Sequence, residues 1–271
     1  MEAGLKYLRN RAIYGVWLKR PPTPLELQLP AVRWDPPAGA QPGPQEHPEL
    51  PGLWLLRGAI TQLDALRIAG LFRGLAAGGR AEWFRYNFGR DMLPLHPNPP
   101  IASEALRDVL PGHVFGEPGS RGADPVGGWP RLQELVAEAA EGASELQALQ
   151  QLPARHVPAF REQPCLFIQA QALEPGAEVT AHKDPLPDGG HAIATAVVAG
   201  SSDVRVGSVR FRVETGDVYC LADDARYEVE HEILASPSER LSITMRYGLH
   251  FRPGYVLAPV GGDAPAAASE E

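Results

Sequence analysis

The chain has 271 residues, of which 44% are hydrophobic and 21% are charged, a composition typical of one elaborated globular domain or two small ones. A net charge of -8 argues against general affinity for nucleic acid, which normally needs a basic surface, but it is compatible with a local basic groove. No stretch is apolar for long enough to span a membrane, and no secretory signal is visible. We therefore expect a monomeric intracellular protein, cytoplasmic or nuclear, in which Cys165 and Cys220 are small core residues.

Residues 1–52 are predicted to form a proline-rich N-terminal extension. The first twenty residues carry five basic side chains and one acidic side chain, which favours a solvated basic strand or helix. A nucleic-acid-contacting arm and an organelle-targeting segment are the alternatives for these twenty residues. Residues 21–52 hold ten prolines, so we expect extended chain or a linker there.

Residues 53–160 are predicted to form a helical, lid-like region packed on a C-terminal core. Leu53–Leu56 reads as a short buried strand, and Thr61 with Asp64 resembles the capping box that begins a helix. Gly78-Gly79 is expected to end that helix. Its buried face should be the apolar stripe of Ile68, Leu71, Phe72 and Leu75.

The stretch 81–90 interleaves aromatic residues with arginines, a pattern that can stack a nucleic-acid base and hold its phosphate. The alternative is a strand with one buried aromatic face, and the two interpretations are compatible. The candidate substrate-binding residues are Trp83, Arg85, Tyr86 and Asn87.

Residues 91–128 look rich in loops, with one short helix expected around 103–110. Pro130 is expected to open a helix at its first position, and a second helix should cover 144–152. Both helices would brace the outside of a sheet.

Residues 161–257 are predicted to be the β-rich core, and 258–271 a disordered tail. Strands are expected at 179–184, 193–199, 204–213 and 218–221, with turns at Pro175-Gly176 and at 214–217. Many short strands with Gly and Pro turns favour a jelly roll or barrel. Gln169 and Gln171 alternate with apolar residues, and they either face the interior or mark an exposed edge.

His182 and Asp184 are two residues apart, so on a strand they project from one face. His231 could supply a third ligand from another strand. Two histidines and one carboxylate with open positions form the facial triad of non-haem Fe(II) oxygenases. We expect these three residues to be the catalytic metal ligands.

Arg240 and Arg246 are separated by an even number of residues, so they share one strand face with Ser242 and Thr244. Leu241, Ile243 and Met245 point to the opposite face, into a core. Two guanidinium groups aimed at a polar space suit a dicarboxylate. Beside a metal triad, they suggest 2-oxoglutarate as cosubstrate.

These motifs resemble the AlkB family of Fe(II)/2-oxoglutarate-dependent dioxygenases. The resemblance rests on Glu174-Pro-Gly-Ala177, the segment 181–184, Thr215-Gly-Asp-Val-Tyr219, His231 and the strand 240–246. It implies an α+β, mainly β fold: a double-stranded β-helix, or jelly roll, with flanking N-terminal helices. It also implies that Arg240 pairs with the distal carboxylate of the cosubstrate, and that Arg246 lies near the metal end or the substrate.

The chain departs from this family in two places. Many members have a second acidic residue directly after the His-x-Asp motif, where this chain has Pro185. The usual Asn-x-Tyr, which contacts 2-oxoglutarate, is replaced by Gln171 and Leu173. The resemblance implies oxidation of N-alkyl groups on DNA or RNA bases. The acidic charge and the two replacements favour an alternative, a same-fold oxygenase that hydroxylates or demethylates a protein side chain or small molecule. A second alternative is a cupin-like module that binds metal without turnover.

Overall fold

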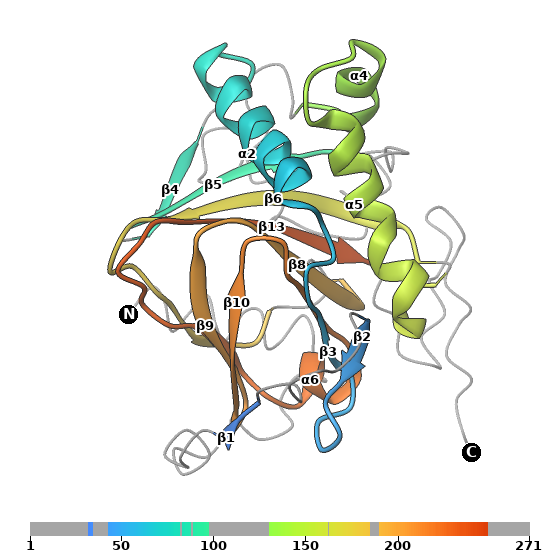
Figure 1. Cartoon of the computed structure of the whole chain (residues 1–271), viewed down its shortest axis with the longest axis vertical. Coiled ribbons are helices and arrows are strands. Elements are labelled where there is room, and N and C mark those ends of the chain that lie inside the picture. The colour runs from blue at the N-terminus through green and yellow to red at the C-terminus, as the bar shows by residue number, and fades with distance from the viewer. Residues whose placement is uncertain are drawn as a thin grey trace, which may run out of the picture.

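Two β-sheets face each other and enclose a hydrophobic core in the computed structural model, which describes residues 32–34, 43–81, 83–87, 89–97, 130–161, 163–184 and 190–248 (Figure 1). The larger sheet has the strand order β2-β3-β11-β8-β13-β6-β5-β4, and the smaller sheet has the order β1-β10-β9-β12-β7.

The strands of the larger sheet are β2 (Pro44–Glu46), β3 (Leu53–Leu56), β4 (Phe84–Asn87), β5 (Arg90–Leu95), β6 (Cys165–Leu173), β8 (Ala192–Ala199), β11 (Val218–Leu221) and β13 (Arg240–Tyr247). Those of the smaller sheet are β1 (Val32–Arg33), β7 (Val179–His182), β9 (Ser201–Val206), β10 (Val209–Glu214) and β12 (His231–Ile233).

From β6 to β13 the chain passes back and forth between the two sheets. Strands β6, β8, β11 and β13 lie in the larger sheet, whereas β7, the hairpin β9–β10, and β12 lie in the smaller one. This winding is a double-stranded β-helix, so the predicted fold class is confirmed. Strands β2 to β5 extend the larger sheet at both of its sides.

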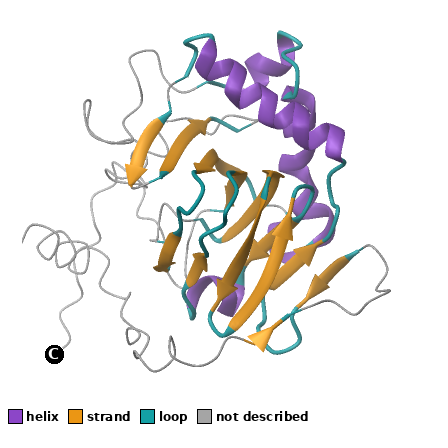
Figure 2. Ribbon diagram, turned by 60° about the vertical axis from the view of Figure 1, so that its left-hand side comes forward, coloured by secondary structure: helices purple, strands orange, loops and turns teal. Residues whose placement is uncertain are grey.

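The helices cover the outer face of the larger sheet. They are α2 (Gln62–Ala77), α4 (Leu132–Ala137), α5 (Ala143–His156) and the short 3-10 helix η1 (Pro158–Phe160) (Figures 1 and 2). The predicted start of α2 is confirmed, because the Thr61 side chain accepts a hydrogen bond from the Asp64 backbone N–H. Gly78 caps its other end, as expected. A further short helix, α6 (Asp223–Tyr227), precedes β12.

Strand β13 separates two chemically different spaces. Leu241, Ile243 and Met245 pack into the core between the sheet and the helices. Arg240 is buried on the opposite face, which looks into the space between the two sheets. The alternation predicted for this strand is confirmed. Because β6 lies between β13 and β5, its two glutamines are buried and the exposed-edge interpretation of that strand is wrong.

Several predicted boundaries need correction. Residues 91–95 are strand β5 and not loop. Among the described residues β4 pairs only with 90–92, so Pro94 has a partner strand on one side alone, a position in which proline is tolerated. Pro130 does not open α4, because its carbonyl accepts from the His96 N–H and the helix begins at Leu132. The segment 204–213 is two strands, since the chain turns at Gly207.

Other expectations concern residues outside the described part of the chain, namely the basic segment 1–20, the short helix at 103–110 and the tail 258–271. Cys165 and Cys220 are buried free thiols, as predicted. In the described residues, no helix combines the length and apolar character that a membrane crossing requires.

The packing of α2 against the sheet leads to a first prediction. Phe72 is fully buried, whereas Leu66 on the same helix is 63% exposed. Phe72→Ala should lower the free energy of unfolding by about 3–5 kcal/mol, because it removes buried surface and leaves a cavity. Leu66→Ala should change it by no more than about 0.5 kcal/mol. Denaturant unfolding of both variants checks this, and equal effects would contradict the assignment of the buried face.

Candidate metal centre

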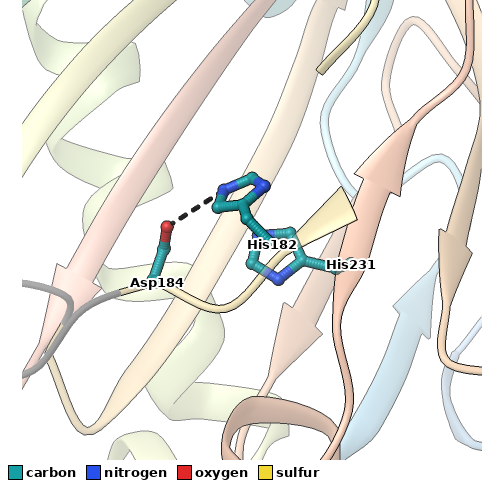
Figure 3. Close-up of side chains that lie close together, drawn as sticks. All are labelled: His182, Asp184 and His231. Atoms are coloured by element: carbon teal, nitrogen blue, oxygen red, sulfur yellow. Dashed lines mark ion pairs between the residues drawn. The ribbon is translucent and has the colours of Figure 1, made fainter. Parts of the chain in front are cut away.

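Strands β7 and β12 bring two histidines side by side at one end of the smaller sheet. The strands are antiparallel neighbours, and His182 is the direct cross-strand partner of His231. Asp184 lies two residues after His182, just beyond the end of β7. The expectation that His182 and Asp184 share one strand is therefore wrong for Asp184, because β7 ends at His182. The carboxylate still turns toward the His182 ring (Figure 3).

The three side chains form a compact group. The distance from His182 Nε2 to Asp184 Oδ1 is 3.3 Å, and the two imidazole centroids are 4.4 Å apart. One potential ligand atom from each residue lies within 4.8 Å of the others. Within the described residues, no other group of three His, Cys, Asp or Glu side chains meets this condition.

The surroundings of both histidines suit them to bind a metal. His182 Nδ1 lies 2.7 Å from the Thr180 carbonyl oxygen, which can only accept, so this nitrogen carries the proton. The Nε2 lone pair is then directed at the centre of the group. Burial lowers the pKa of His231 to about 3, so this ring is neutral at physiological pH.

Asp184 is held as an anion in a buried position. Burial by itself would raise the pKa of this carboxyl, but the positive charge of Arg246 above all, with that of Arg226, holds it well below its usual range. Arg246 Nη2 donates to Asp184 Oδ2 at 2.9 Å. With Oδ2 engaged, Oδ1 is the oxygen that faces the histidines and is available to a cation.

The loop that carries Asp184 is fastened to α6 from both sides. Lys183 Nζ donates to the backbone carbonyls of Tyr227 at 3.1 Å and Glu228 at 2.6 Å, at the C-terminal end of the helix. In return, Arg226 Nη1 donates to the Asp184 carbonyl at 3.0 Å. Since His231 follows α6 by only a few residues, this reciprocal pairing fixes Asp184 relative to His231.

A row of polar side chains leads away from this group along the inner faces of β13, β6 and β8. Thr244 Oγ1 and Thr195 Oγ1 are 3.3 Å apart. Arg240 lies at the far end, 1% exposed, and none of its three nitrogens makes a hydrogen bond to a described residue. Burial lowers the pKa of Arg240, and the nearby Tyr219 offsets this only in part.

The other predicted site residues fall in two places. Gln171 lies in the polar row, where it accepts a hydrogen bond from Arg90. Trp83 is half-buried and packs against the core beneath the helices. Arg85, Tyr86 and Asn87 belong to β4, for which the structure describes the backbone alone.

Three residues near the site were not found from the sequence. Lys183 and Arg226 act through backbone carbonyls, which no sequence pattern reveals. Arg90 begins a strand that contains a proline, so the pairing of that strand with β6 was missed.

No family model and no curated protein matches the sequence. Among solved structures, OsALKBH1 is similar with 16% identity over 75% of this chain and 99% of that chain, at a TM-score of 0.46. A Pseudomonas putida prolyl-4-hydroxylase has 15% identity over 74% of this chain and 94% of that chain, at a TM-score of 0.43. A Trichoplax adhaerens prolyl hydroxylase, solved with a hypoxia inducible factor peptide, has 11% identity over 73% of this chain and 83% of that chain, at a TM-score of 0.44.

The donor set fits a divalent first-row transition metal and Fe(II) in particular. Two imidazoles and one ionised carboxylate are the donor set of a facial triad, which leaves further coordination positions open on the metal. The carboxylate is held by Arg246, as expected of a ligand whose second oxygen is hydrogen-bonded.

A second prediction follows from this arrangement. Asp184→Ala should abolish the stabilisation that Mn(II), used in place of Fe(II), confers on the wild type, which is about 2.7 kcal/mol at a hundred times the dissociation constant. The variant will itself be less stable, because Arg246 loses its partner. The metal-induced shift in melting temperature is therefore the quantity to compare.

Asp203→Ala is the matched control for this experiment. Asp203 is a carboxylate of the same sheet that pairs with Arg210 and Arg212, away from the three ligands. Its removal should leave the metal-induced shift intact. A shift retained in Asp184→Ala would show that Asp184 is not a ligand.

Proposed function

We propose that this protein is an Fe(II)- and 2-oxoglutarate-dependent dioxygenase. The observation that carries the proposal is the buried guanidinium of Arg240, which has no hydrogen-bond partner among the described residues and shares an inner face with the ligand group. An isolated buried charge costs several kcal/mol, so a fold that retains one requires a compensating ligand. A carboxylate is the natural partner for the planar guanidinium fork.

The two ends of this row of polar side chains differ in charge, and the difference would orient a bound dicarboxylate. Arg246 at the metal end is already neutralised by Asp184, whereas Arg240 at the other end is not. A dicarboxylate would therefore place its distal carboxylate on Arg240, with its 2-oxo acid end toward His182, Asp184 and His231. Ser242, which is buried with an unpaired hydroxyl two residues from Arg240, would add a further hydrogen bond.

His182, Asp184 and His231 would hold the metal. When bound, Fe(II) would supply activation of O2: 2-oxoglutarate would lose CO2 and take one oxygen atom to become succinate, and the other oxygen atom would enter a substrate C–H bond. Neighbouring groups of the protein would position these ligands. The Thr180 carbonyl sets the His182 tautomer, and Arg246 keeps Asp184 ionised and directs its Oδ1 inward. The pairing of Lys183 and Arg226 with α6 keeps the ligands in place.

The leading candidate substrate is an N-alkylated base in DNA or RNA, and hydroxylation of its alkyl carbon would release an aldehyde and the free amine. Support comes from β4, which pairs with β5 at the side of the larger sheet and carries Arg85, Tyr86 and Asn87. The half-buried position of Trp83 leaves less of its ring for stacking, which favours a second candidate, a protein side chain or small molecule. A metal-binding module without turnover would form no succinate.

A third prediction separates a binding role of Arg240 from a structural one. Arg240→Met keeps the length and apolar stem of the side chain but removes the charge. Without ligand, this variant should be at least as stable as the wild type, because an uncompensated buried charge has gone. Its affinity for 2-oxoglutarate in the presence of Mn(II) should fall by several kcal/mol, a loss typical of buried charge pairs.

Titration calorimetry and thermal unfolding measure the two quantities, and Mn(II) binding should survive in the same variant. Arg212→Met, at a half-exposed arginine of β10, is the control. If Arg240→Met lowers stability and leaves the affinity for 2-oxoglutarate unchanged, Arg240 is structural.

A fourth prediction concerns the substrate class. If a nucleic acid is the substrate, binding of a short methylated single-stranded oligonucleotide should weaken as salt rises, because phosphate contacts release counterions. Arg85→Ala should reduce this salt dependence, and Trp83→Ala or Tyr86→Ala should weaken binding by about 1–3 kcal/mol if its ring stacks on a base. Fluorescence anisotropy checks both effects. Absence of binding at low salt would favour a protein or small-molecule substrate.

A further inference from the structure

Arg90 and Arg240 lie on either side of the same residue in the larger sheet. Strand β6 is paired with β5 on one side and with β13 on the other (Figure 1). In both pairings Leu173 is the cross-strand partner, of Arg90 in β5 and of Arg240 in β13. Direct cross-strand partners point to the same face, so both arginines share the inner face of the sheet with Leu173.

Arg90 determines which way the amide of Gln171 is turned. Arg90 Nη2 lies 3.1 Å from Gln171 Oε1. A guanidinium only donates hydrogen bonds, so the atom of Gln171 that faces it must be the oxygen. The amide nitrogen, Nε2, is then directed away from Arg90. It is buried and has no hydrogen-bond partner among the described residues.

The unpaired nitrogen of Gln171 belongs to the same group of donors as Arg240. Ser242, the cross-strand partner of Gln171, has a buried hydroxyl that is also unpaired within the described chain, and Arg240 is two residues further along β13. A buried donor without an acceptor destabilises the fold, and a charged donor does so more strongly. Three neighbouring groups that all lack an acceptor indicate a ligand that brings acceptors with it.

We propose that Arg90 is a positioning residue for the dicarboxylate cosubstrate, because it holds the Gln171 amide with Nε2 directed at the carboxylate that Arg240 binds. This inference rests on the proposed function. Ordering a glutamine side chain costs conformational entropy, because its rotamers are lost. With Gln171 ordered by Arg90 before the ligand arrives, the ligand does not bear this cost.

The backbone before Arg90 secures its position. Gly89 has a φ of +68°, a conformation that favours glycine. Its carbonyl accepts a hydrogen bond of 2.8 Å from the Glu174 N–H, directly after β6. A Cβ atom at position 89 would lie 2.7 Å from the Cβ of Ala177, so the start of β5 approaches the turn after β6 more closely than a larger residue would permit.

The sharpest test replaces one atom of the amide. Gln171→Glu keeps an oxygen for Arg90 and strengthens that pair, but it removes the Nε2 donor and adds negative charge near the ligand carboxylate. We expect this variant to fold with at least wild-type thermal stability and to bind 2-oxoglutarate at least about tenfold more weakly in the presence of Mn(II), the effect of losing one hydrogen bond to a charged group. A purely structural pair would leave the affinity unchanged.

A double-mutant cycle tests whether Arg90 acts through Gln171. Arg90→Ala should weaken 2-oxoglutarate binding in the wild-type background and have no further effect when Gln171 is already alanine. Arg90→Lys, which retains a donor, should restore part of the affinity. The same titrations with Mn(II) alone should be unaffected in every variant, because these residues do not touch the metal ligands.

The outcomes distinguish this inference from the proposed function. If the wild type with Mn(II) binds no 2-oxoglutarate, the proposed function fails, and the role of Arg90 fails with it. If the wild type binds it and either Gln171→Glu binds equally well or the effect of Arg90→Ala persists in the Gln171→Ala background, only the positioning role is overturned.

Discussion

The buried guanidinium of Arg240 is the constraint around which the interior of this protein is arranged. A charge between two sheets weakens the fold unless it is paired, and no described side chain forms a hydrogen bond with it. The opposite face of the same strand packs three apolar side chains beneath helices α2 and α5. The apolar contacts of its outer face therefore hold strand β13 in place. Its inner face can then carry polar groups that destabilise the protein when no ligand is bound.

The two ends of the inner polar row differ in their electrostatic state. At the metal end, the positive charge of Arg246 and the negative charge of Asp184 pair with each other, and burial keeps the His231 ring neutral. At the other end, positive charge is uncompensated. This asymmetry would orient a ligand with unequal ends even before a metal contributes to binding. It also assigns the two arginines of one strand different tasks, although their sequence spacing makes them look equivalent.

The sequence predicts those parts of the protein that depend on local periodicity. The alternation along 240–246 placed both arginines on one face, and the apolar stripe of α2 identified its buried side. Asp184 was placed on a strand, but it lies beyond the end of β7, because cross-strand partners and not the residue pattern decide where a strand stops. Strand β5 and the role of Arg90 depend on pairing with a segment some eighty residues away, which local patterns do not encode.

The position of β7 at the end of the smaller sheet links metal binding to self-association of the protein. Of the described strands, only β12 pairs with β7, and the register between them is irregular beyond the two histidines. A cation bound by His182 and His231 would bridge these strands as a cross-link. Loss of that cation would then loosen β7, which pairs with a single strand in the described part of the chain. A loosened edge strand can pair with another chain, so loss of metal and self-association would be linked.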